Sequence, residues 1–209
     1  MIQPVTMALR ILGLAFRDTW QEFWTILIVQ LLFLFANLLI LPGPPATLAL
    51  FYYSNRIAHG EIATERDFLH AIRQYWGPAW RWGFINLFVI ALLTGDYFLV
   101  GRLTENAEMA AFIQGLYVTL LAGWLVLQLF ALPFLFEQER PLVVQALRNA
   151  ALFIRRNLIF AFVLVSLLGL SLAAGVLAFM LTFALGGAFV AFACNHAVLK
   201  ELAPTELPV

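Results

Sequence analysis

The sequence predicts an all-α, polytopic helical membrane protein with about six membrane segments, the second of them short, and with amphipathic helices at the membrane interface. Two observations carry this prediction. First, 63% of the 209 residues are hydrophobic and only 11% are charged, with a mean hydropathy of +0.91, whereas about a quarter of the residues of a soluble protein are charged. Second, the apolar residues lie in long uninterrupted runs, as they do in transmembrane helices.

The N-terminal part predicts an interfacial helix over residues 7–23, followed by a first membrane segment over residues 24–41. Leu9, Phe16 and Trp20 recur at helical spacing in the interfacial helix, with charged residues elsewhere on its surface. This is the pattern of an amphipathic helix that lies on a membrane. The 18 uncharged residues that follow make about 27 Å of helix, which nearly matches a hydrocarbon core of about 30 Å.

Residues 45–59 form the short second segment. Pro44 and Pro45 suit the first turn of a helix, where a missing N–H group has no partner to lose. The 14 residues from Pro45 to Ala58 make only about 21 Å of helix. Three arrangements are therefore open: the segment crosses a thinned bilayer, continues through His59, or dips into the membrane and turns back.

The rest of the chain alternates amphipathic helices with membrane segments, all within a single integral membrane domain that spans residues 1–209. A basic, aromatic-rich cytoplasmic helix over residues 64–76 ends at a break at Gly77-Pro78. The uncharged run from residue 157 to residue 199 is long enough for two membrane segments, with the turn expected at Gly169–Gly175. The further elements are membrane segments at 83–101, 109–136, 157–175 and 177–199, and a second cytoplasmic amphipathic helix at 141–156.

The distribution of Lys and Arg residues predicts the orientation of the chain. If residues 45–59 cross the membrane, 11 of the 12 Lys and Arg residues lie on one side and only Arg102 lies on the other. If that segment alone fails to cross, the split becomes 9 to 3. Because cytoplasmic loops carry the excess of Lys and Arg, the first arrangement is favoured. It predicts a multi-pass protein of the cell membrane with both termini cytoplasmic.

The region after the first apolar run has the features of a known family. The run GPPATLALFYY at residues 43–53 is followed by a basic segment that ends in Gly60-Glu61, by a helix with aromatic and basic residues, and by a span that ends near Asp96. This order resembles the YesL-like family of bacterial integral membrane proteins over roughly residues 10–100, and the second half matches only in layout. The family usually has one proline where this chain has Pro44-Pro45. The resemblance implies a membrane protein of unknown function, with no catalytic residues to transfer and a role beside carbohydrate transport.

Two places in the sequence are candidates for a functional site. Asp96 is the only acidic residue well inside an apolar run, and it is interpreted either as a proton or cation site or as an interfacial carboxylate. The helix start at Pro44, Pro45 and Thr47 would direct its positive dipole end and unpaired N–H groups toward an anion or a substrate oxygen. The alternative for that helix start is a purely structural turn.

The uncharged polar residues within the apolar runs are interpreted as hydrogen-bond partners between helices rather than as a substrate pathway. They are Gln30, Asn37, Asn86 and Gln128. Asn195 and His196 are expected at the cytoplasmic end of the last segment. No second His or Cys lies at metal-ligand spacing, and no catalytic or phosphate-binding motif is present. We therefore expect no catalytic residue, no cofactor and no metal.

These patterns favour a non-catalytic membrane protein over an enzyme. The leading hypothesis is an accessory or regulatory component associated with solute transport, with carbohydrate as the solute class that the resemblance implies. The alternative is a small oligomeric transporter or channel that uses the broken helix at Pro42–Pro45 together with Asp96. The expected partners are the lipid bilayer and either a membrane transport protein or a second copy of the chain. A net charge of zero argues against nucleic acid.

Overall fold

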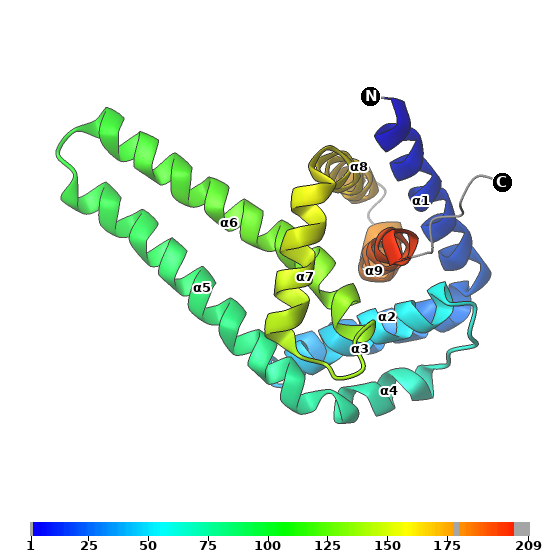
Figure 1. The fold of residues 1–209 in the computed structure, drawn as a ribbon. Helices are drawn as coiled ribbons and strands as arrows, with labels where there is room; N and C mark the ends of the chain where they lie inside the picture. The colour runs from blue at the N-terminus through cyan, green and yellow to red at the C-terminus, as the bar shows by residue number, and fades with distance from the viewer. Residues whose placement is uncertain (1, 178–179, 203–209) are drawn as a thin grey trace.

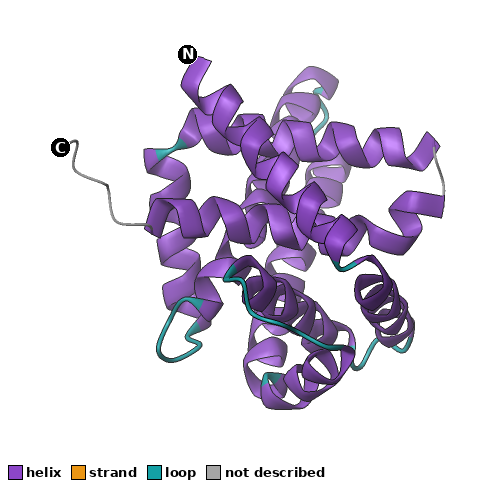
Figure 2. Cartoon of the chain, turned by 90° about the vertical axis from the view of Figure 1, so that its right-hand side faces the viewer, coloured by secondary structure: helices purple, strands orange, loops and turns teal. Residues whose placement is uncertain are grey.

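The computed structural model describes residues 2–177 and 180–202, and over these residues the chain forms nine helices and no strand. The predicted all-α class is therefore confirmed. Figure 1 shows two parts: α5 and α6 run antiparallel and extend to one side, and the other helices pack together into a body. Figure 2, turned by 90°, shows that the helices of the body run in several directions. We call the α5–α6 pair the arm.

Two helices, α5 and α6, are each long and apolar enough to cross a membrane. Two further spans result if each of two bent helix pairs counts as one, so the described part of the chain offers two to four candidate spans by length and composition. Many of its large apolar side chains are exposed to the surroundings. Such a surface suits a lipid environment, because a monomeric soluble protein seldom exposes large contiguous apolar areas.

The first two helices are α1 (Ile2–Gln21) and α2 (Phe23–Leu38), and they meet at an angle of 93°. Small and buried residues of α1, such as Ala8 and Ala15, face the body. Leu9, Phe16 and Trp20 lie on the outer face and are 54%, 63% and 69% exposed. The apolar stripe predicted for the interfacial helix thus faces outward, as expected for a helix whose outer surface contacts lipid.

The short second segment is the centre of the body. It forms α3 (Gly43–Ala58), which starts after the turn at residues 39–42 and carries its prolines in the first turn. Most of its residues are buried, and it packs against α2, α4, α5, α6 and α9. At 16 residues it is about 24 Å long. A helix that is buried on nearly all sides needs apolar residues all round, which explains the absence of a polar face before residue 54.

The amphipathic helix α4 (Glu65–Gln74) is fixed at its start by charged and polar contacts. Thr64 and Asp67 form a capping box, with the Thr64 N–H and hydroxyl 2.8 and 2.9 Å from the Asp67 carboxylate. Arg56, at the end of α3, bridges Glu61 at 2.8 Å and Asp67 at 3.0 Å. The bond from the Thr64 backbone N–H, then its hydroxyl and the Arg56 charge, lower the pKa of Asp67.

The break after α4 lies at Tyr75, not at Gly77-Pro78 as predicted. The next helix, α5, runs from Trp76 to Leu103, so residues 76–82 belong to the long helix and the span predicted at 83–101 is only part of it. Pro78 falls in the first turn of α5, where a proline removes no hydrogen bond. The proline therefore marks a helix start, and the sequence reading had placed it after a helix end.

The arm consists of α5 and α6 (Ala107–Phe136), which are about 42 and 45 Å long. Asn106 caps α6 by accepting hydrogen bonds from the N–H groups of Glu108 and Met109, both at 3.0 Å. The outer two thirds of the arm is largely exposed, whereas residues 130–135 of α6 are buried in the body. The arm is thus anchored by the C-terminal end of α6.

The last three helices are α7 (Val143–Arg156), α8 (Leu158–Leu177) and α9 (Met180–Leu202), and α7 meets α8 at 102°. The turn predicted at Gly169–Gly175 is wrong, because α8 continues to Leu177. Each glycine costs a helix only about 1 kcal/mol relative to alanine. The Ser171 hydroxyl also donates to the Leu167 carbonyl at 2.8 Å, within its own helix. The connection from α8 to α9 falls on residues 178–179, which lie outside the described residues.

Candidate functional site

Polar side chains from four helices gather where the C-terminal parts of α1, α3, α6 and α9 come together. We call this group the polar cluster. Its members are Asp18, Asn55, His59, Glu137, Asn195 and His196. Asn195 is fully buried, while Asp18 and Asn55 are 4% and 8% exposed. Because buried polar groups are costly unless they are hydrogen-bonded, this cluster is the strongest candidate for a site that the fold assembles.

Asn195 connects α9 to α3 on one side of the cluster. Its side-chain N–H₂ donates to the carbonyls of Phe51 at 3.3 Å and Ala191 at 2.9 Å, and its Oδ1 accepts from Asn55 Nδ2 at 3.3 Å. Asn55 Nδ2 also donates to Glu137 Oε1 at 2.6 Å. One amide therefore joins α3 to both α6 and α9.

His59 extends this arrangement toward the surface. Its Nε2 lies 3.6 Å from Glu137 Oε1, and its Nδ1 lies 2.9 Å from the carbonyl oxygen of Asn55. The side chain of His59 is 38% exposed and that of Glu137 is 18% exposed. The Glu137 carboxylate thus lies between a buried amide and a histidine that contacts the surroundings.

A second pair, Asp18 and His196, joins α1 to α9. His196 Nε2 lies 2.6 Å from Asp18 Oδ2, and the two side chains are 11% and 5% exposed. Arg17, on the outer side, donates two hydrogen bonds to Asp18 Oδ1 at 3.0 and 3.1 Å. The carboxylate therefore binds a buried imidazole and an exposed guanidinium at the same time, an arrangement that fixes the orientation of α1 against α9.

Two hydroxyls of α3 lie buried without a hydrogen-bond partner among the described residues. They belong to Tyr53 and Ser54, both fully buried. No group of three or more His, Cys, Asp or Glu side chains in the described part of the chain is arranged to hold a metal ion. In chemical terms the cluster can hold four helices together through hydrogen bonds and charged contacts.

The predicted helix-start site is a packed junction. Gly43 N donates to the Ile40 carbonyl at 3.0 Å, and Ala46 N makes the first helical bond, to the Pro42 carbonyl, at 2.8 Å. Pro44 and Pro45 have no N–H group to offer. The first turn of α3 therefore presents no unpaired backbone donor to an anion.

Thr47 and Pro44 have partners of their own within the protein. The Thr47 hydroxyl donates to the Gly43 carbonyl at 3.0 Å, one turn back in the same helix. Pro44 packs against α5 so closely that a Cβ on Gly83 would lie 3.1 Å from the Pro44 ring. These contacts fit the structural-turn alternative for this helix start.

Asp96 lies on the arm, away from the polar cluster and from Thr47. It is partly exposed, and it makes no hydrogen bond or ion pair within the described residues. The structure therefore does not bring the two sequence-predicted candidates into one site. Their functional roles remain predictions.

The polar residues expected to link helices do so at two places. Trp82 Nε1 donates to Gln128 Oε1 at 2.9 Å, and Trp124 Nε1 donates to Asn86 Oδ1 at 3.0 Å, which ties α5 to α6. Gln30 Oε1 accepts from the backbone N–H of Ala188 at 3.2 Å, which ties α2 to α9. Asn37, by contrast, donates back to its own helix, to the Phe33 carbonyl, and makes no bond to another helix within the described residues.

Sequence reasoning missed the polar cluster, although one signal was present. Ala8, Ile11, Ala15 and Asp18 follow one another at helical spacing and share the buried face of α1. An acid on a stripe of small and apolar residues indicates a buried carboxylate. No comparable local signal marks Asn55, because its partners are 82 and 140 residues away in the sequence.

Comparison with known proteins gives a match to a family model. Residues 26–97 match the model of a family described as "Protein of unknown function, DUF624". YesL-like proteins belong to this family, so the resemblance predicted from the sequence is confirmed over this segment. The match runs from α2 through α3 and α4 into α5. Curated proteins and solved structures gave no significant match.

Proposed function

We propose a function from the match of residues 26–97 to the model of the DUF624 family. The protein is a multi-pass component of the cell membrane that acts without catalysis as an accessory or regulatory subunit of a solute transport system. Carbohydrate is the solute class that the resemblance implies. The arm is the docking element for the transport partner, and the body holds the arm in place.

One observation carries this proposal: α6 presents a stripe of small residues on the exposed part of the arm. Gly115, Thr119 and Gly123 are spaced four residues apart and are all exposed, and a Cβ on either glycine would meet nothing within 4 Å. A shallow depression of about 350 Å³ adjoins Thr119 and Gly123. In membranes, helices associate through such small-residue stripes, because close backbone approach replaces the hydrophobic effect as the source of attraction.

The polar cluster supports an accessory role over solute passage. Its buried amides bind one another and helix carbonyls. A pathway for solute would require groups that exchange protein partners for solute. In the cluster each amide instead closes a contact between helices, as in a rigid anchor for the arm.

For the orientation we propose both termini in the cytoplasm. The C-terminal ends of α3, α6 and α9 share the polar cluster, which supports a common side for all three ends. This side carries 11 of the 12 Lys and Arg residues. The arm and the α8–α9 pair then make four crossings.

The remaining two of the six membrane segments, α2 and α3, form a hairpin that enters and leaves on the cytoplasmic side. One contact and one surface property support this arrangement over two full crossings. Pro44, at the start of α3, packs against Gly83, in the second turn of α5 and so near the end of that helix that is cytoplasmic in the proposed orientation. The hairpin turn is also strongly apolar, with Leu38 and Ile40 being 77% and 78% exposed, which suits a tip inside the bilayer. Such a hairpin leaves the 11 to 1 charge split unchanged.

Labelling of single cysteines in intact cells tests this orientation. With Cys194 fully buried and replaced by Ala, we expect Glu105→Cys, at the tip of the arm, to react with an impermeant thiol reagent. Ile62→Cys, 88% exposed between α3 and α4, should react only after the cells are opened. Leu41→Cys, in the hairpin turn, should also stay protected. Reaction of Leu41→Cys from outside would establish two full crossings, and reaction of Ile62→Cys from outside would overturn the orientation.

Site-specific photo-crosslinking tests the accessory role. A photo-reactive amino acid at Leu116 or Leu120, beside the small-residue stripe, should crosslink to a membrane-embedded subunit of a co-expressed carbohydrate transporter. Gly115→Leu or Gly123→Leu should abolish this product and lower the uptake rate. Gly95→Leu is the matched control, because Gly95 is equally open but lies on α5. Crosslinks to lipid alone, or uptake that is unaffected by the stripe variants, would contradict the proposal.

The second candidate function is a small oligomeric transporter or channel, which Asp96 favours because its carboxylate has no partner among the described residues. Purified protein in vesicles should then carry a sugar or an ion, and Asp96→Asn should reduce the flux. Thr47→Val is the companion variant for the broken helix at Pro42–Pro45. Absence of flux by the unmodified protein across a panel of sugars and ions would exclude this function.

A further inference from the structure

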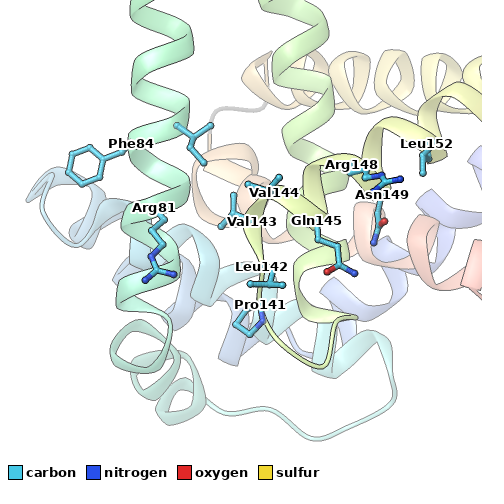
Figure 3. A pocket seen from close by; sticks show the side chains of 11 residues that line it. Arg81, Phe84, Pro141, Leu142, Val143, Val144, Gln145, Arg148, Asn149 and Leu152 are labelled. Carbon is cyan, nitrogen blue, oxygen red and sulfur yellow. The ribbon is translucent and has the colours of Figure 1, made fainter.

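A groove of about 950 Å³ lies between the start of α5 and the start of α7 (Figure 3). Arg81 and Phe84 of α5 form one wall, and α7 with the preceding residues Pro141 and Leu142 forms the other. Arg148 also lines the groove and lies on α7, one helical turn after Val144. The groove is open to the surroundings and is separate from the polar cluster.

The charge of the groove is positive and uncompensated. Neither Arg81 nor Arg148 makes an ion pair within the described residues, and none of the residues that line the groove is acidic. A neighbouring depression, which shares Asn149, contains both Glu137 and Arg156 and is balanced. The groove between α5 and α7 therefore attracts an anion, and the adjacent depression does not.

The start of α7 adds backbone donors to this positive surface. Leu142 is the N-cap residue and its apolar side chain caps nothing, and the first helical bond is made by Ala146 N to the Leu142 carbonyl at 3.0 Å. Within the described residues no acceptor pairs with the N–H groups of residues 143–145. Unpaired N–H groups at the positive end of a 14-residue helix favour a negatively charged group.

The remaining surface of the groove is apolar and exposed. Phe84, Leu142 and Val144 are 61%, 51% and 73% exposed. A free phosphate ion would use the arginines and leave this apolar surface uncovered, whereas a phospholipid would use both. A groove with both positive charge and exposed apolar side chains thus favours an amphiphilic ligand with an anionic headgroup.

We propose that this groove is a binding site for one anionic phospholipid. The headgroup phosphate lies between Arg81 and the start of α7, within reach of Arg148, and an acyl chain covers Phe84, Leu142 and Val144. In the proposed orientation the groove opens at the cytoplasmic face of the membrane. The proposal rests on the membrane location, and it is independent of the accessory role and of any transport partner.

Spin-labelled lipids test this site in the full-length protein reconstituted in vesicles. The fraction of spin-labelled phosphatidylglycerol immobilised by the protein should exceed that of spin-labelled phosphatidylcholine. Arg81→Gln and Arg148→Gln should each reduce this preference about fivefold, the effect of one cation near an anionic surface. Val144→Asn should weaken the immobilisation of phosphatidylglycerol while leaving both arginines in place.

Arg155→Gln is the matched control, because Arg155 is an exposed arginine of the same helix outside the groove. It should retain the preference of the unmodified protein. An equal loss in Arg155→Gln would mean that the basic surface attracts lipid without a site, and would overturn the proposal. Displacement of the lipid by inorganic phosphate, or formation of a disulfide-linked dimer by Val144→Cys, would do so as well, since either shows a different occupant.

Discussion

Replacing Asp18 should destabilise the protein, because within the described residues its carboxylate joins the polar cluster to α1. The His196 Nε2 to Asp18 Oδ2 distance is 2.6 Å, and both side chains are at least 89% buried. Asp18→Ala removes the acceptor and leaves the His196 ring buried without a partner. Asp18→Asn keeps the size and one acceptor oxygen, and removes only the charge.

The magnitude follows from the burial and from the bonds that are lost. A hydrogen bond to a charged group contributes about 1.5–3 kcal/mol in soluble proteins, whereas interhelical hydrogen bonds in membranes average about 0.6 kcal/mol and reach about 1.7 kcal/mol. The two bonds from Arg17 add little, because that side chain is 58% exposed. We therefore expect Asp18→Ala to cost about 2 kcal/mol and Asp18→Asn about 1 kcal/mol.

A double-mutant cycle separates the pair from the loss of side-chain packing. The variants are Asp18→Ala, His196→Ala and the double variant, unfolded by denaturant in detergent micelles and followed by circular dichroism. The expected coupling energy is about 1–2 kcal/mol. Asp96→Asn provides the control, since this acid has no partner among the described residues, and it should leave the unfolding midpoint unchanged. A coupling energy below about 0.3 kcal/mol would refute the reasoning, because the effects of mutations at independent sites add to within about that value.

Three further predictions concern backbone packing, capping and pH. Gly83→Val should cost about 1–3 kcal/mol by overpacking against Pro44, whereas Gly77→Ala, where a Cβ meets nothing within 4 Å, should be neutral or stabilising; thermal unfolding of the two variants checks this. Asn106→Ala should cost about 0.5–2 kcal/mol through loss of the α6 cap, measured by the same denaturant unfolding. Because the pKa of Asp67 is lowered in the folded state, its contribution to stability is present above the pKa of an unfolded aspartate and is lost as the pH falls through the folded pKa. Asp67→Asn should therefore flatten the acid limb of a plot of stability against pH, and an unchanged limb would contradict this assignment.

The helices themselves could be predicted from the sequence, because each one is marked by a local pattern. The segments predicted at 45–59 and 141–156 correspond to α3 (Gly43–Ala58) and α7 (Val143–Arg156). The errors arose where one residue type is compatible with two structures: proline with a helix start or a helix end, and glycine with a turn or a helix interior. Pro78 was placed after a helix end and lies in a helix start, and the glycines near residue 170 are tolerated within α8.

Apart from Asp18, the polar cluster could not be predicted, because hydrogen bonds between distant residues leave no periodic signal. Asn55 and Asn195 are ordinary polar residues in their own segments, and the packing of α3 against α9 brings the two amides together. The small-residue stripe is different in kind. Its spacing of four residues can be seen in the sequence. The structure adds that a Cβ on Gly115 or Gly123 would meet nothing within 4 Å, which leaves room for a partner helix. A local motif thus becomes informative only once its exposure is known.

For the hairpin of α2 and α3, the count of Lys and Arg residues on each side does not determine the number of membrane crossings, whereas a contact between helices does bear on it. The Lys and Arg distribution is sensitive to the number of crossings only through whether that number is odd or even, so two full crossings and one hairpin that turns back give the same 11 to 1 split. The packing of Pro44 against Gly83 is sensitive to depth instead, because it brings the start of α3 beside the second turn of α5. A 16-residue helix of about 24 Å that begins at that level cannot also begin at the opposite face. The accessibility of Leu41 from outside the cell therefore distinguishes two full crossings from a hairpin, although both arrangements give the same charge split.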